Sequence, residues 1–105
     1  MSAALAQEML RDHPLIPLLD VRSEAAGGES IAGARRLPYA TLVANLGSLQ
    51  PWATGTVILI AEDRASGERA CELLATSGFS NVVFVRDGAE VWLSHQRRGR
   101  SADAR

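Results

Sequence analysis

The only thiol available for nucleophilic chemistry in this sequence is that of Cys71, the single cysteine of the chain. A thiolate is the reactive form, and it needs a lowered pKa, which a helix N-terminus or neighbouring cations can supply. Cys71 falls instead inside a predicted helix, on the face that Leu74 and Gly78 share at i, i+3 and i+7 spacing. We expect that face to pack on a sheet. Cys71 is therefore interpreted as a small buried side chain without a redox role.

A polar segment between a predicted strand and a predicted helix is the second feature that could do chemistry. It consists of Glu62, Asp63, Arg64, Ala65, Ser66 and Gly67. A loop between a strand and a helix can direct backbone N–H groups toward a bound anion. A carboxylate beside that anion opposes it by about 1 kcal/mol or more. We expect a ligand-binding loop at which Glu62 and Asp63 disfavour small anions.

Metal and hydrolase chemistry have little support in this sequence. One cysteine excludes an internal disulfide and a cysteine-based zinc cage, and the two histidines, His13 and His95, are far apart. Ser66 and Ser77 lack a histidine and acid at any recognisable spacing. We expect no metal and no cofactor.

Composition points to one small domain. The chain has 105 residues, of which 47% are hydrophobic and 22% charged, enough for a packed core. No apolar run approaches a membrane span and no secretory signal begins the chain, so we expect a cytoplasmic protein with no membrane contact. The net charge is −1. Residues 95–105 contain four arginines and one aspartate, so this segment is basic. We expect one domain over 1–95, a basic tail over 96–105 and no binding of nucleic acid.

The hydrophobic pattern predicts alternating strands and helices. Helix 2–12 carries Leu5 and Met9 on an apolar side, and a loop with one short turn covers 23–38. The runs at 56–61 and 81–85 are apolar without alternation, as in strands buried on both faces of a parallel sheet. The other expected elements are a strand at 15–21 and helices at 39–49, 67–77 and 89–95. Strand, helix and strand with tight connections form a βαβ unit, which favours an α/β fold with a mainly parallel sheet.

Four stretches in this order resemble the rhodanese-like domain, a sulfurtransferase fold. LLDVRSE (18–24) is similar to the family's first strand and its Asp-Val-Arg signature. SIAGARRLP (30–38), RACELLATSGFSNVVFV (69–85) and DGAEVW (87–92) resemble the stretches that follow it. The resemblance implies a three-layer α/β/α domain with a mainly parallel sheet of four to five strands. It also places Asp20 and Arg22 at the base of the active-site loop, where we expect them to make supporting polar contacts.

The chain departs from the family pattern at the nucleophile. Active rhodaneses carry a cysteine directly after the strand that TVILI resembles, and the matching residue here is Ala61. Alanine has no reactive atom, so the resemblance implies a variant that lacks the active-site cysteine.

Two functions stay open on these grounds. The first is a catalytically inactive rhodanese-like domain that serves as a binding or regulatory module for a protein partner. The second is a thiosulfate or persulfide sulfurtransferase that acts through Cys71 or through a partner's cysteine. Its support is the usual activity of the fold, which is an argument by analogy.

Overall fold

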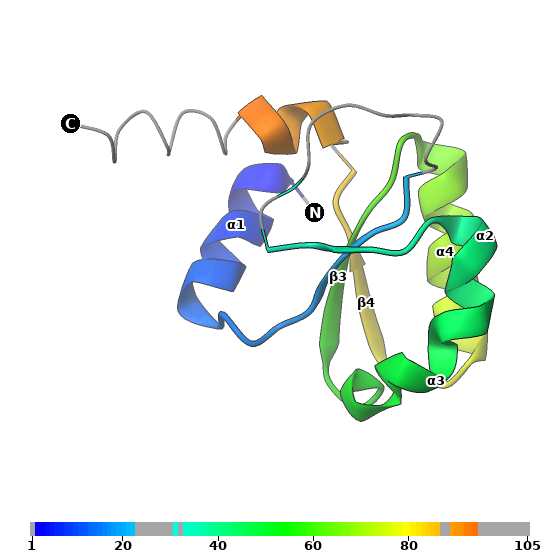
Figure 1. Cartoon of the computed structure of the whole chain (residues 1–105). Coiled ribbons are helices and arrows are strands. Elements are labelled where there is room, and N and C mark those ends of the chain that lie inside the picture. The colour runs from blue at the N-terminus through cyan, green and yellow to red at the C-terminus, as the bar shows by residue number, and fades with distance from the viewer. Residues whose placement is uncertain (1, 23–30, 32, 87–88, 95–105) are drawn as a thin grey trace.

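Four parallel strands form the centre of the molecule (Figure 1). The computed structural model describes residues 2–22, 31, 33–86 and 89–94, so the expected basic tail at 96–105 lies outside the described residues. The strands are β1 (Leu18–Asp20), β2 (Arg35–Arg36), β3 (Thr56–Ile60) and β4 (Asn81–Phe84), in the spatial order β2-β1-β3-β4. The predicted α/β class with a parallel sheet is confirmed.

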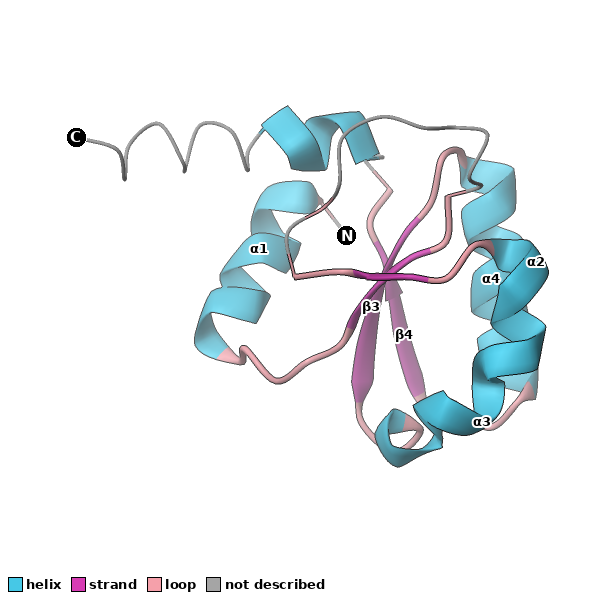
Figure 2. Cartoon of the chain, viewed as in Figure 1, coloured by secondary structure: helices cyan, strands magenta, loops and turns pink. Residues whose placement is uncertain are grey.

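Helices cover both faces of this sheet. Figure 2 shows α1 (Ala3–Asp12) on one side of the sheet, and α2 (Tyr39–Leu42), α3 (Leu46–Leu49) and α4 (Arg64–Thr76) on the other. Short 3₁₀ turns, η2 (Val43–Asn45) and η3 (Gln50–Trp52), join and extend the α2–α3 segment, and residues 89–94 are helical. The arrangement is the expected three-layer α/β/α sandwich. Within the described ranges, no helix is long and apolar enough to cross a membrane.

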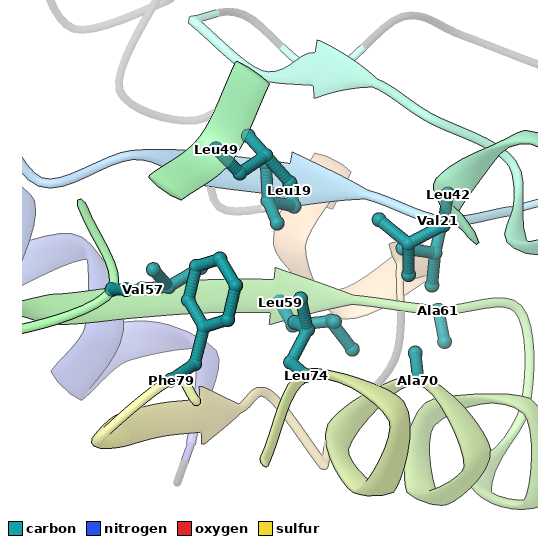
Figure 3. Packing of buried hydrophobic residues seen from close by; sticks show 11 residues of the cluster. Leu19, Val21, Leu42, Leu49, Val57, Leu59, Ala61, Ala70, Leu74 and Phe79 are labelled. Carbon is teal, nitrogen blue, oxygen red and sulfur yellow. The ribbon is translucent and has the colours of Figure 1, made fainter. Parts of the chain in front are cut away.

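The alternation of side chains along β3 divides the core into two clusters. Val57, Leu59 and Ala61 belong to one cluster. Figure 3 shows Leu59 beside Leu74 and Ala61 beside Ala70, both on α4, and Val57 beside the ring of Phe79. The intervening side chains of β3, Ile58 and Ile60, pack with α1 and the helix at 89–94. All five of these β3-side residues are at most 1% exposed, because helices cover both faces of the strand.

Helix α4 begins three residues earlier than the sequence predicts. Asp63 is its N-cap, and the Asp63 Oδ1 accepts a hydrogen bond from the backbone N–H of Ser66 at 2.7 Å. The expected six-residue loop is therefore wrong in its extent: Arg64, Ala65, Ser66 and Gly67 form the first turn of the helix. The helix begins early because the Asp63 side chain accepts a hydrogen bond from a backbone N–H that has no partner within the helix.

The other end of α4 follows the prediction. Gly78 has φ +100°, the left-handed conformation that glycine adopts without strain, directly after the helix. The N–H of Phe79 donates to the Leu74 carbonyl at 3.0 Å, and the N–H of Gly78 donates to the Ala75 carbonyl at 3.2 Å. This is a Schellman motif, and it turns the chain directly into β4.

Several boundaries differ from the sequence-based predictions. The strand expected at 15–21 shortens to Leu18–Asp20, because Pro17 lacks the N–H that a longer strand would use. β2 lies inside the segment expected to be a loop. The helix expected at 39–49 is interrupted by a 3₁₀ turn, and Leu5, expected on the buried side of α1, is 52% exposed. Ala3 and Ala6 are the buried residues of α1, since small side chains let the helix approach the sheet.

Gly67 is a packing residue rather than part of a ligand loop. A Cβ atom built on Gly67 would overlap the ring of Phe84 on β4. Only a residue without a side chain lets α4 approach β4 this closely.

We expect Gly67→Ala to destabilise the fold by about 1–2 kcal/mol, because overpacking outweighs the gain of about 1 kcal/mol in helix propensity. In a Phe84→Val background the same change should become neutral or stabilising. Gly47→Ala in α3 is the matched control, since nothing lies within 4 Å of a Cβ there. Urea denaturation of the four variants measures this. Equal effects of Gly67→Ala with and without the Phe84 ring would contradict the assignment.

Candidate functional site

A pocket opens at the carboxyl edge of the sheet, where ligands bind in open α/β folds. Its volume is about 510 Å³. It lies beyond the ends of β1, β2 and β3, because its walls come from the segments that follow these strands and from the first turns of α4. The lining residues are Val21, Pro38, Tyr39, Ala40, Thr41, Glu62, Ser66 and Arg69.

This pocket combines apolar walls with charges of both signs. Glu62 and Arg69 lie in its lining together with Val21 and Pro38. The negative charge of Glu62 helps to raise the pKa of the buried Arg22. A pocket of this kind suits a ligand with an apolar body and a few polar groups better than it suits a compact dianion.

Asp63 places a second carboxylate at the start of α4. Hydrogen bonds from Ser66 are the main cause that lowers the pKa of Asp63, and the charge of Arg69 adds to the effect. The group is therefore an anion at neutral pH. Its carboxylate accepts the Ser66 N–H, one of the N-terminal amides that a bound anion would otherwise use.

Ala61 lies in the core rather than on the pocket surface. It is 1% exposed and belongs to the cluster that contains Leu42 and Ala70. Figure 3 shows its methyl group next to the side chain of Ala70 on α4. A reactive group at this position would have to avoid the apolar cluster to reach a ligand.

Asp20 and Arg22 form a buried ion pair beside the pocket. They are 2% and 5% exposed. Arg22 Nη2 donates to Asp20 Oδ2 at 2.9 Å, Arg22 Nε donates to Asp20 Oδ1 at 3.0 Å, and the backbone N–H of Arg22 donates to the same Oδ1 at 3.1 Å. The hydrogen bond to Asp20 is the main cause that raises the pKa of Arg22, against the opposing effect of burial.

Arg36 completes this cluster from the edge strand. Its Nε lies 3.8 Å from Asp20 Oδ2 and donates to the Arg22 carbonyl at 3.3 Å. The aspartate thus holds together β1, the residues after it and β2. The sequence analysis expected Asp20 and Arg22 to support the site, but neither is among the residues that line the 510 Å³ pocket. Asp20 lines a smaller hollow together with Ile31, Ala34 and Arg36.

Cys71 lies on the flank of α4 and lines neither wall of the pocket. It is half-buried, and burial together with the charge of Glu68 raises the pKa of its thiol. Of the face predicted to be buried, Leu74 is buried and Cys71 packs partly buried against the core, but Gly78 is exposed. The fully buried residues of α4 are Gly67, Ala70 and Leu74. Gly78 is exposed because it belongs to the turn after the helix.

Sequence reasoning missed part of the pocket lining. The sequence analysis did not select Tyr39, Thr41 or Arg69. Tyr39 and Thr41 follow the carboxyl end of β2, and Arg69 lies about one turn after the start of α4. If the sequence analysis had started the helix at residue 64, it would have placed Ser66 and Arg69 on one side of the helix at i, i+3 spacing. In the part of the chain that the structure describes, no three His, Cys, Asp or Glu side chains gather as a metal site requires.

Comparison with known proteins agrees with this architecture. The family model of the rhodanese-like domain matches residues 2–95, and the chain belongs to this family. A search of the curated proteins found no match. Related folds include the Alr3790 protein from Anabaena sp., with a TM-score of 0.77 and 23% identity over 90% of this chain and 85% of that one.

Two similar structures are described as sulfurtransferases. The human single-domain sulfurtransferase TSTD1 has a TM-score of 0.68 and 22% identity, covering 86% of this chain and 91% of that chain. The thiosulfate sulfurtransferase from Pseudomonas aeruginosa has a TM-score of 0.73 and 24% identity, covering 91% of this chain but 19% of that much longer one. At these identities the likeness establishes the fold.

We expect Arg22→Met to destabilise the domain by about 3–5 kcal/mol, because it leaves the Asp20 carboxylate buried beside a single, more distant cation. Arg36→Met is the matched control and should cost about 1 kcal/mol or less, since the Arg36 side chain is 34% exposed. Chemical denaturation measures both. Similar losses for the two variants would show that burial of the Asp20–Arg22 pair is not decisive.

We expect the Cys71 thiol to react with iodoacetamide more slowly in the folded domain than in the unfolded chain at pH 8. Its raised pKa reduces the thiolate fraction, and the side chain is partly buried. Glu68→Gln should accelerate the reaction and Glu72→Gln should not, because Glu68 is the charge that acts on the thiol. Labelling as fast as in urea would overturn this assignment.

Proposed function

We propose that this rhodanese-like domain is catalytically inactive in sulfur transfer and serves as a binding or regulatory module for a protein partner. The observation that carries the proposal is Ala61, which is buried in the core and which the sequence resemblance aligns with the family's nucleophile. Sulfur transfer of the rhodanese type needs a thiolate that attacks a sulfane sulfur and keeps it as a persulfide while sulfite leaves. The methyl group of Ala61 cannot take that role.

The start of α4 supports the same proposal. In this chain the Asp63 carboxylate accepts the hydrogen bond of Ser66 N–H at 2.7 Å, so an internal anion already uses one backbone donor of the helix N-terminus. Glu62 adds a second negative charge to the pocket lining. Thiosulfate would have to displace one carboxylate and approach another.

The pocket itself supports binding without chemistry. Its apolar surface, with Glu62 and Arg69 nearby, offers contacts for a partner's apolar side chain and polar backbone. The proposed partner is a protein segment that inserts into this pocket at the carboxyl edge of the sheet.

The competing function is sulfur transfer through Cys71 or through a partner's cysteine. The raised pKa of Cys71 and its place outside the pocket lining disfavour the first route. The second route needs only a pocket that holds the sulfur donor, so it fails if thiosulfate does not bind.

The test is a thiosulfate:cyanide assay on the wild-type domain and on Ala61→Cys. We expect no turnover by the wild type and little by Ala61→Cys, because a thiol at position 61 enters an apolar cluster that raises its pKa. Adding Glu62→Gln and Asp63→Asn to Ala61→Cys removes two charges while asparagine keeps the helix cap. This should raise the residual rate by roughly five- to tenfold per charge.

Two results would contradict the proposal. A wild-type rate that disappears in Cys71→Ser would show an active enzyme. Full activity of Ala61→Cys with both carboxylates present would show that neither burial nor loop charge limits the site.

A further inference from the structure

The pocket of about 510 Å³ at the carboxyl edge of the sheet, which we call the carboxyl-edge pocket, has one acid and one base in its lining. Glu62 directly precedes Asp63, the N-cap of α4, and Arg69 lies in the second turn of that helix. Both side chains are exposed. A partner that enters the pocket therefore meets one negative and one positive charge of the described lining.

The base in this lining is not part of an internal ion pair. Arg64 Nε lies 3.1 Å from Glu68 Oε1 on the outer side of α4, whereas the ion pairs of the described residues do not include Arg69. The charge of Arg69 acts on Asp63, whose carboxylate already accepts the Ser66 N–H. A carboxylate of a partner can therefore approach Arg69 without breaking an ion pair.

The apolar part of the pocket is held in place by hydrogen bonds. Val21 is 1% exposed, so it lies at the bottom of the pocket, and Pro38 and Tyr39 belong to one wall. The Tyr39 N–H donates to the Val21 carbonyl at 3.3 Å, and Thr41 Oγ1 donates to the Pro38 carbonyl at 3.0 Å. Because these bonds join the wall to the bottom, an apolar side chain can enter with little ordering of the pocket.

We propose that the carboxyl-edge pocket binds an extended protein segment that carries an apolar residue between a basic and an acidic residue. This inference rests on the proposed function and adds the chemical class of the partner. The apolar side chain enters the pocket, the basic residue meets Glu62, and the acidic residue meets Arg69.

The two lining charges favour this class over a segment with charges of one sign. A segment with only one sign is attracted by one lining charge and repelled by the other, whereas a segment with both signs is attracted by both. In an extended chain, side chains two positions apart face the same side. We therefore place the charged residues two positions before and two positions after the apolar residue, in either order.

Capped pentapeptides test this pattern by ¹H–¹⁵N NMR titration of the full chain at low ionic strength. Each has the form Ac-X-Ser-Leu-Ser-Z-NH₂, where X and Z are Lys and Glu, Lys and Lys, Glu and Glu, or Gln and Gln. We expect the Lys and Glu probe to bind with a dissociation constant of about 1 mM and to shift the backbone signals of Val21, Tyr39 and Ser66. The other probes should bind roughly three- to tenfold more weakly. Serine in place of the leucine should weaken binding about tenfold or more.

Charge reversal in the pocket lining should change which probe binds best. Arg69→Glu leaves two acids in the lining and should favour the Lys and Lys probe, and Glu62→Arg should favour the Glu and Glu probe. The neutral variants Arg69→Gln and Glu62→Gln should each lose one of the two attractions, which keeps the test valid if a charge reversal prevents folding.

Arg11→Glu and Glu8→Arg are the matched controls. They change the net charge of the domain by the same amounts at exposed positions of α1, which lies on the other side of the sheet (Figure 2) and outside the pocket lining. Both controls should bind the Lys and Glu probe best, like the wild type.

Three outcomes would overturn the inference. The first is the absence of shifts at the pocket with every probe at about 10 mM. The second is equal binding of the four probes that differ in charge, and the third is a change of preference in the α1 controls as large as in the pocket variants. The thiosulfate assay remains the separate test of the proposed function: an inactive domain that ignores the charges of the probes contradicts this inference alone.

Discussion

The structure depends on a central strand that is buried on both faces. β3 has a neighbour on each side and helices above and below, so its residues 57–60 are apolar and each faces one of two cores. This alternation directs Val57, Leu59 and Ala61 into the cluster that contains Ala70 and Leu74 of α4. Ala61, which directly follows the strand, is therefore part of the core, and the next residue, Glu62, is exposed. The position of the site follows from this constraint, because the parallel strands all end at one edge.

The polar features near that edge act mainly within the protein. Asp63 accepts a backbone hydrogen bond of α4, and Asp20 accepts three hydrogen-bond contacts from Arg22 at or below 3.1 Å. Both carboxylates thus stabilise the ends of elements that line the pocket. What remains for a ligand is an apolar pocket with Glu62 and Arg69 at its surface. Such a surface is suited to recognition by shape, with polar groups that set the orientation of the ligand.

The sequence predicted the strands at 56–61 and 81–85 correctly to within one residue. Short unbroken runs of β-branched and apolar residues are typical of strands that are buried on both faces. Gly78 ended α4 as expected, since only a left-handed turn leads directly into the next strand. The start of α4 was missed because Asp63 reads equally well as a loop acid and as an N-cap. β2 was missed because it consists of two exposed arginines, which show none of the hydrophobic alternation that predicts a strand. Gly67 was assigned to a ligand loop because its close contact with Phe84 depends on tertiary packing.

The central claim is that no group in this domain accepts sulfur from thiosulfate. The most direct test is the intact mass of the purified protein before and after incubation with thiosulfate, followed by alkylation to locate any modified thiol. The account predicts an unchanged mass before alkylation and a single ordinary thioether on Cys71 after denaturation. A gain of one sulfur atom on Cys71 that a reductant removes would contradict it and would identify the domain as a sulfurtransferase.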